Sequence, residues 1–204
     1  MYVFNRTRIT NPTDLPEAKA LAVKIASVAS KIIGRPITAF ETRFGGPGHV
    51  SWSTPVEDMA TMSDLTEKLS ADPAFQKLID KGRSLWGHAE DQLMQIIASS
   101  ITSSENQLYA STVATPAPGK LAEVMAYGVK VQEYVTKAGF HGVFGASTFG
   151  RYGEVGWLAG FDSMTEVDAF QKFLHSDAGM AKLIDSSGPL FVAGSGFNRL
   201  VSRL

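Results

Sequence analysis

Ionisable side chains occupy the middle of predicted β-strands in the first part of the chain. Glu41 and Arg43 are two residues apart, so in a strand both project from the same face of the sheet. Charges in mid-strand cost free energy to bury unless they are paired. We therefore expect a polar pocket in which Arg43 stabilises a developing negative charge while Glu41 or His49 moves a proton. A surface ion pair, or a rim contact between the two halves of the chain, is the alternative that this pattern leaves open.

Four more residues are candidates for contact with a ligand. Arg6 and Arg8 share one face of a strand predicted over residues 2–9, and Arg6 could replace Arg43 as the cationic group. Trp52 and Trp157 could form apolar walls of a cavity. We favour a role in the hydrophobic core, with each indole N–H bonded locally, because a tryptophan kept at equivalent positions suits a structural role.

Both tryptophans belong to a segment that the chain contains twice. Between positions 44 and 80, 12 of 37 residues recur at a constant offset of 105, which is 157 minus 52. An internal repeat of this length indicates duplication of a structural unit. The recurring residues include Phe44-Gly45, Gly48, Val50, Trp52, Met59, Leu69, Asp72 and Lys77-Leu78-Ile79-Asp80.

The two copies differ in their charges. The same offset relates Arg6, Arg8, Glu41, Arg43 and His49 to Ser111, Val113, Ala146, Thr148 and Glu154. Four ionisable groups thus become neutral and the fifth becomes acidic. We interpret this asymmetry as a binding pocket confined to the first copy.

Each copy has the pattern strand, helix, strand, strand, helix, strand. Alternating or β-branched stretches predict the strands, and apolar residues at helical spacing predict the helices. In the first copy, Ser63 is expected to begin one helix, and Asp72-Pro73 to begin another that extends toward Trp86. The order predicts an α+β fold of tandem ferredoxin-like repeats, in which the two sheets cover each other's helix-free face. The predicted domains are residues 1–97 and 107–204, joined by a serine-rich linker at 98–106.

The segment that runs from Trp52 to Asp72-Pro73-Ala74-Phe75-Gln76 carries a resemblance to a known family. With its weaker echo at Trp157 and Asp177-Ala178, it resembles the dimeric α+β barrel superfamily, in particular its NIPSNAP-like and antibiotic-biosynthesis-monooxygenase-like branches. The resemblance implies that the tandem repeats form an intramolecular α+β barrel. It also implies an activity drawn from a wide range that includes cofactor-independent monooxygenases and haem-degrading enzymes.

Composition argues against several kinds of site and partner. The chain has no cysteine, which excludes disulfides and thiolate chemistry. The histidines, which are His49, His88, His141 and His175, show no metal-binding spacing, and we expect no metal. A net charge of −1 without a basic run predicts no nucleic-acid partner. No apolar run is long enough for a membrane span, and we expect a cytoplasmic protein.

These observations leave more than one function open. The leading hypothesis is a barrel that binds a small organic ligand, with monooxygenase-like activity and no cofactor. The alternative is a non-catalytic binding or assembly module, and the sequence does not decide whether the chain is an enzyme. The resemblance adds haem as a weaker alternative, with His49 or His175 as a single axial ligand. Pairing of two such pseudo-dimeric chains into a homodimer is a further expectation.

Overall fold

The computed structural model describes residues 1–46, 48–101 and 105–204. Its contacts divide the chain into two units. Unit 1 comprises Met1–Met94 with Val201–Leu204, and unit 2 comprises Gln95–Leu200. Position 47 and positions 102–104 of the predicted linker lie outside the described residues. The boundaries 1–97 and 107–204 stay a prediction.

Unit 1 follows the predicted order of elements, with two helices between its third and fourth strands. A short 3-10 helix, Pro12–Asp14, precedes α1. The elements are β1 (Tyr2–Thr10), α1 (Leu15–Ile33), β2 (Thr38–Phe44), β3 (His49–Val56), α2 (Met59–Ala71), α3 (Pro73–Gly82) and β4 (Trp86–Ser99), whose last residues belong to unit 2.

Unit 2 repeats this order. A 3-10 helix, Gly188–Leu190, follows its last α-helix. The elements are β5 (Leu108–Ala114), α4 (Leu121–Lys137), β6 (Gly142–Phe149), β7 (Val155–Phe161), α5 (Met164–Ser176), α6 (Ala178–Ser187) and β8 (Phe197–Arg203), whose last residues belong to unit 1.

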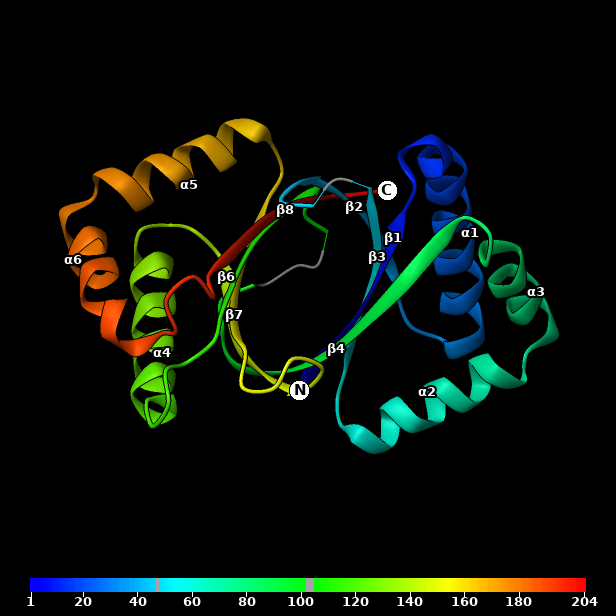
Figure 1. Ribbon diagram of the computed structural model, residues 1–204, viewed down its shortest axis with the longest axis horizontal. Coiled ribbons are helices and arrows are strands. Elements are labelled where there is room, and N and C mark those ends of the chain that lie inside the picture. The colour runs from blue at the N-terminus through cyan, green and yellow to red at the C-terminus, as the bar shows by residue number, and fades with distance from the viewer. Residues whose placement is uncertain (47, 102–104) are drawn as a thin grey trace. The chain divides into compact units, whose positions relative to one another are not determined.

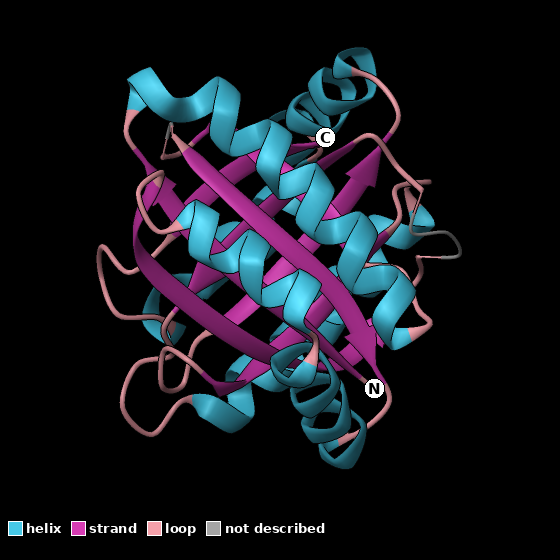
Figure 2. Cartoon of the chain, turned by 90° about the vertical axis from the view of Figure 1, so that its right-hand side faces the viewer, coloured by secondary structure: helices cyan, strands magenta, loops and turns pink. Residues whose placement is uncertain are grey.

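The strands hydrogen-bond as a closed barrel in the order β1-β3-β2-β8-β5-β7-β6-β4. Read from β4, the first four strands have the order β4-β1-β3-β2, and the second four have the equivalent order β8-β5-β7-β6. This is the ferredoxin-like order, so the predicted α+β class with ferredoxin-like repeats is confirmed. In each unit the helices lie on one face of the sheet (Figure 1). Figure 2 turns the chain so that the helices of unit 1 face the viewer.

Local signals in the sequence explain where the helices begin and end. Gly34 ends α1 with a φ of 71°, a left-handed conformation that costs glycine little. The Asp72 side chain accepts a hydrogen bond from the Phe75 N–H and caps α3, as predicted. The expected start of α2 at Ser63 is wrong, because Asp58 caps this helix by accepting from the Thr61 N–H. The expected extension of α3 to Trp86 is also wrong, because Trp86 begins β4.

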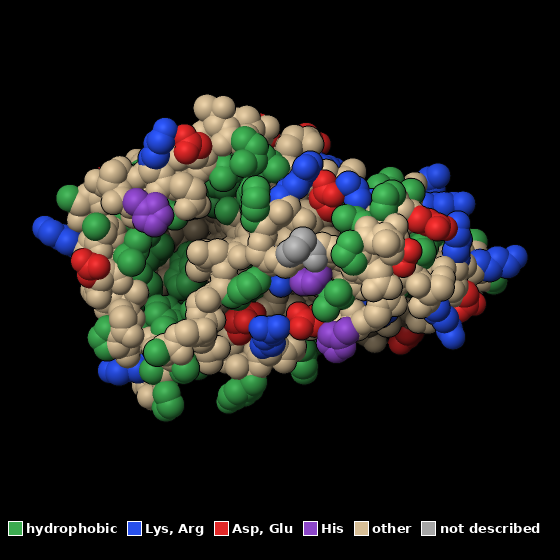
Figure 3. Space-filling model, turned by 45° about the horizontal axis from the view of Figure 1, so that its top comes forward, with side chains coloured by type: hydrophobic (Ala, Val, Ile, Leu, Met, Phe, Trp, Pro, Cys, Tyr) green, Lys and Arg blue, Asp and Glu red, His purple; other side chains and the backbone are tan. Residues whose placement is uncertain are grey.

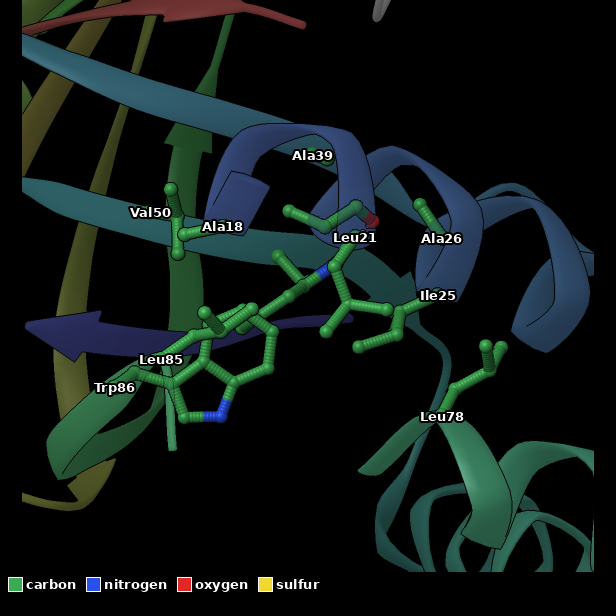
Figure 4. Close-up of a cluster of buried hydrophobic side chains, with 11 residues drawn as sticks. Ala18, Leu21, Ile25, Ala26, Ala39, Val50, Leu78, Leu85 and Trp86 are labelled. Atoms are coloured by element: carbon green, nitrogen blue, oxygen red, sulfur yellow. Dashed lines mark hydrogen bonds between the residues drawn. The ribbon is translucent and has the colours of Figure 1, made fainter. Parts of the chain in front are cut away.

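Each unit has a hydrophobic core between its helices and its sheet. In unit 1 the core includes Leu21 and Ile25 of α1, Leu78 of α3 and Trp86 (Figure 4). The three leucine and isoleucine side chains come from the apolar stripes of the helices, which explains why one face of the sheet is covered and the other is free of helices. On the face of the molecule drawn in Figure 3, basic and acidic side chains are interspersed. Within the described ranges, no helix is long and apolar enough to cross a membrane.

Candidate functional site

Glu41 lies at the centre of an ion-pair cluster that joins three elements of unit 1. Lys19 Nζ of α1 is 2.5 Å from Glu41 Oε2, and Arg43 Nη2 is 3.1 Å from Glu41 Oε1. Ser202 Oγ of β8 donates to Glu41 Oε1 at 3.2 Å and accepts from Arg43 Nε at 2.8 Å. Glu41 and Arg43 therefore share a face, as the two-residue spacing indicated. The sequence did not predict Lys19 and Ser202 as partners of Glu41, because neither residue is close to β2 in the chain.

The cluster holds the Glu41 carboxylate in its ionised form. Burial raises the pKa of Glu41, but the hydrogen bond from Lys19, the charges of Lys19 and Arg43 and the bond from Ser202 together outweigh burial. The net pKa lies below the usual value of 4.5. A carboxylate with a depressed pKa is a poor proton acceptor at neutral pH. This geometry is better suited to joining α1, β2 and β8 than to general-base catalysis.

Arg6 and Arg8 are also engaged on the helix-covered side of the sheet. Arg6 makes a two-pronged ion pair with Asp91 of β4, with nitrogen–oxygen distances of 2.7 and 2.6 Å. This bond raises the pKa of Arg6 despite partial burial. Arg8 Nη1 donates to the Gly87 carbonyl at 3.5 Å, and burial followed by repulsion from Arg6 lowers the pKa of Arg8. Both donors of this bidentate bond are directed at Asp91, so the Arg6 guanidinium already has a partner within the chain.

Trp52 is a core residue in this structure. Its side chain is packed between the sheet and α1, with 7% of the residue exposed. The indole Nε1–H donates to the Ala22 carbonyl at 2.9 Å, and the ring meets Trp86 edge to face at a centroid distance of 5.5 Å. Its polar atom is therefore satisfied by α1, which matches the core alternative from the sequence.

Trp157 has the equivalent place in unit 2 and is less deeply buried. Its Nε1–H points to the Gly128 carbonyl of α4 at 3.4 Å. Three aromatic rings surround it, with centroids 4.9 to 6.2 Å away, and these belong to Phe144, Tyr127 and Phe191. Gly128 makes room for this cluster, because a Cβ on it would lie 2.1 Å from the Phe144 ring.

The structure places His49 apart from the other candidates. Val50 and Trp52 of β3 pack against the helices, so the intervening residues of the strand project from the opposite face. By the same alternation, and by the pairing of Arg6 with Trp52 and Glu41 with Val50, the candidate charges lie on the helix-covered face. His49 is half-buried and lies against Gly46 of the turn. The single pocket expected from the sequence is therefore divided between two faces of the sheet.

The helix-free face of unit 1 carries a set of polar side chains. Asn5 lies opposite Ser53, and Thr7 lies opposite Ser51, across the β1–β3 pair. Thr7 and Ser51 are buried, and the Asn5 amide donates to Thr7 Oγ1 at 3.2 Å. These hydroxyl and amide groups can donate and accept hydrogen bonds without carrying charge. They were not chosen as site residues from the sequence, although strand alternation already separated Asn5 and Thr7 from Arg6 and Arg8.

On the same face of unit 2, most of the equivalent residues are apolar or glycine. Arg6 lies opposite Trp52 and Thr112 lies opposite Trp157, so the offset in β1 and β5 is 106, which is 112 minus 6. The sequence-based equivalents of Arg6 and Arg8 are thus corrected by one residue, to Thr112 and Ala114. With this register, Asn5, Thr7, Ser51 and Ser53 correspond to Ser111, Val113, Gly156 and Leu158. The polar set is specific to unit 1.

The two histidines that the sequence raised for haem lie on different elements. His175 lies in the exposed last turn of α5, and His49 of β3 packs on a turn. Among the described residues, no group of three or more His, Asp or Glu side chains is placed to hold a metal ion.

Comparison with known proteins identifies the fold. No protein-family model matches the chain, and no curated protein matches it. Solved structures do match over its whole length. A Fusobacterium nucleatum protein assigned as a monooxygenase superposes with a TM-score of 0.71 at 11% identity, covering 100% of this chain and 92% of its own. The chain has the dimeric α+β barrel fold.

Other dimeric α+β barrels match in the same way. An anthrone oxidase-like protein has a TM-score of 0.68 at 12% identity, with 100% of this chain and 90% of that chain covered. The heme-degrading enzyme of Listeria monocytogenes has a TM-score of 0.57 at 5% identity, with 99% of both chains covered. The resemblance to this superfamily stated from the sequence is confirmed. At such identities the likeness concerns the fold, and the activity has to be argued from residues.

Proposed function

We propose that this chain binds a small organic molecule on the helix-free face of the unit 1 sheet and oxygenates it without a cofactor. The observation that carries the proposal is the polar set of Asn5, Thr7, Ser51 and Ser53, on a face where unit 2 has mostly apolar residues or glycine. Buried hydroxyl and amide groups are costly unless they are hydrogen-bonded, and a polar ligand would supply partners. The fold is one in which structures assigned as monooxygenases occur.

In this proposal His49 transfers the proton. A substrate whose CH₂ group is acidic because it is conjugated through aromatic rings to a ketone loses a proton to the imidazole, which leaves an enolate. The enolate gives electrons to O₂, a carbon–oxygen bond forms at that carbon, and cleavage of the O–O bond releases water and leaves a ketone. One O₂ is consumed for each CH₂ converted to C=O. Ser51 and Asn5 would hold the enolate oxygen by hydrogen bonds.

The other candidates have supporting roles in this proposal. Glu41, Arg43 and Arg6 already have partners of opposite charge on the helix-covered face. Arg8 lies on that face as well, and we assign the four to holding the strands and α1 together. Trp52 and Trp157 are assigned to the cores, because each indole N–H points to a helix carbonyl.

The proposal is tested by oxygen uptake with anthrone, an aromatic ketone with an acidic CH₂ group. Wild-type protein should consume O₂ and form anthraquinone above the uncatalysed rate. His49→Gln should lower this rate about 100-fold, the typical contribution of a general base. His175→Gln is the matched control and should keep the wild-type rate. Equal rates for wild type and His49→Gln would remove the assignment of His49.

A non-catalytic binding role is the second candidate. It is favoured by the pairing of Glu41, Arg43 and Arg6 within the chain. Of the titratable residues that the sequence suggested for the site, His49 is then the one on the polar face. This role predicts that anthrone or a related phenol binds, with a loss on Ser51→Ala, while no oxygen is consumed. Isothermal titration alongside the oxygen electrode separates the two functions.

A further inference from the structure

A groove opens on unit 2 where α4 ends and α5 begins. Its volume is about 400 Å³, and its lining includes Asn106, Phe140, His141, Phe161, Asp162 and Glu166. Neither lysine nor arginine lines it in the described part of the chain. A hollow bordered by hydrophobic side chains is visible on the face drawn in Figure 3. The groove thus combines aromatic walls with two carboxylates, and its lining contains no lysine or arginine to pair with them.

Unit 1 has a hollow at the equivalent place. It measures about 480 Å³, and besides Met1 its lining consists of five residues, which are Arg35, Pro36, Pro55, Val56 and Glu57. At the offset of 105, which is 162 minus 57, these residues correspond to Phe140, His141, Gly160, Phe161 and Asp162, and all five line the groove of unit 2. The bounds of the neighbouring elements agree with this offset, since β3 ends at Val56 and β7 at Phe161. The same hollow therefore occurs twice in the chain.

In unit 1 a guanidinium from the chain itself lines this hollow and pairs with its carboxylate. Arg35 Nη1 is 2.7 Å from Glu57 Oε2 and donates to the Pro55 carbonyl at 3.4 Å. About three quarters of the Arg35 side chain is buried, because 26% of it is exposed. The bond from Arg35 is the main reason why the pKa of Glu57 lies below its usual value. The hollow of unit 1 thus shows how a cation sits beside the carboxylate that follows the strand.

Unit 2 keeps the carboxylate and loses the cation. Phe140 replaces Arg35, while Asp162 replaces Glu57. Asp162 Oδ1 accepts from Asn106 Nδ2 at 3.2 Å, and the Asp162 N–H donates to Glu166 Oε2 at 2.9 Å. Both are neutral donors, and neither carboxylate forms an ion pair within the described residues. A second carboxylate at Glu166, where unit 1 has Thr61, adds to the negative charge.

We propose that the groove of unit 2 binds a small organic cation, a guanidinium or primary ammonium group on an aromatic body. The cation takes the place beside Asp162 that the Arg35 side chain has beside Glu57. The aromatic body lies along Phe140 and is free to stack there. Because the carboxylates are exposed, the affinity is modest, on the order of 1 mM.

The test is isothermal titration of the full chain with benzylguanidine, with benzyl alcohol as the neutral probe of the same body. Benzylguanidine should bind and benzyl alcohol should not. Asp162→Asn should weaken binding about fivefold, an effect typical of a partly exposed charge pair. Glu57→Gln in unit 1 is the matched control and should leave the affinity unchanged.

A substitution that rebuilds the unit 1 arrangement gives the sharpest result. Phe140→Arg places a guanidinium opposite Asp162 and should abolish benzylguanidine binding, because the new side chain would pair with Asp162 as Arg35 pairs with Glu57. Since Phe140 packs on Phe170 and Phe173, circular dichroism must first show that this variant is folded. Asp162→Asn lies on the surface and provides the independent variant. Equal affinity of wild type and Asp162→Asn, or no binding of benzylguanidine by wild type, would overturn the proposal.

Discussion

Lys19 Nζ of α1 lies 2.5 Å from Glu41 Oε2 of β2, and this contact fixes the start of the helix against the sheet. Glu41 also accepts a hydrogen bond from Ser202, so the last residues of the chain are held at the same point. A charge inside the sheet of unit 1 thus has a structural explanation. The charge difference between the repeats is therefore weaker evidence for a pocket than the sequence indicated.

Glu41→Gln should destabilise the protein by about 2 kcal/mol, because it leaves Lys19 and Arg43 without their shared carboxylate. The value is below that of a fully buried pair, since 34% of the Lys19 side chain is exposed. Urea unfolding measures the change in the free energy of unfolding. Asp80→Asn, which breaks the exposed pair with Arg83, is the control and should cost less than about 0.5 kcal/mol. Equal effects of the two substitutions would contradict a special role for the cluster.

The stabilisation by Glu41 should disappear in acid. Folding lowers the pKa of Glu41 below 4.5, so the ionised form favours the folded state. The contribution is fully present above a pH of about 4.5 and is lost as the pH falls through the lower folded-state value. Urea midpoints of wild type and Glu41→Gln, measured from neutral pH downward, should therefore converge in acid. A constant difference across the whole range would show that ionisation of Glu41 does not matter.

Gly82→Ala should destabilise the core of unit 1 although alanine favours helices. A Cβ at Gly82 of α3 would lie 2.1 Å from Trp86 Cζ2, so the indole ring would have to move. We expect a cost of about 1–3 kcal/mol, the usual range for overpacking. Gly87→Ala is the matched control, since a Cβ there has no neighbour within 4 Å. Thermal unfolding and tryptophan fluorescence report the change; unaltered stability of Gly82→Ala would mean that Trp86 can be displaced freely.

Asp177→Ala should lower the urea midpoint about twice as much as Asp72→Ala, because the Asp177 side chain accepts two hydrogen bonds and the Asp72 side chain accepts one. Asp72 caps α3 through the Phe75 N–H. Asp177 caps α6 through the Met180 N–H and also accepts from the Tyr134 hydroxyl at 2.7 Å.

Tyrosine titration gives a second measurement on the same variant. The bond to Asp177 raises the pKa of Tyr134, so Asp177→Ala should bring that pKa down toward 10.0. Asp72→Ala should leave the tyrosine titration unchanged. A fall in stability without a change in the Tyr134 titration would mean that the hydroxyl bond contributes little.

Much of the fold could be predicted because its signals are local. Alternation in residues 2–9 and the Asp72-Pro73 cap each depend on neighbours within a few positions, and the structure has both. The start of α2 was misplaced because Ser63 and Asp58 are both good capping residues. Trp86 was misplaced because an apolar residue after a helix also fits a strand. In each case packing in the core decided between local signals of similar strength.

The candidate site was harder to predict, because it depends on which face of a strand the helices cover. Spacing showed that Glu41 and Arg43 share a face, but not that His49 lies on the other. It also did not reveal Lys19, Ser202 or Asp91 as partners, since these come from other elements. The repeat itself was informative, and it led to the comparison of Arg35 with Phe140 across the two hollows.

The sequence by itself determined the order of the elements, the repeat and the fold class. Hydrophobic periodicity and capping depend on residues close together in the chain, and the repeat depends on a constant offset, so all three can be recognised without the tertiary structure. Only the tertiary structure decided which charges are already paired and which polar groups share the helix-free face of unit 1. The physical reason is that the range of a hydrogen bond or ion pair is a few ångströms in space, whereas its partners here are as much as 161 residues apart in the chain.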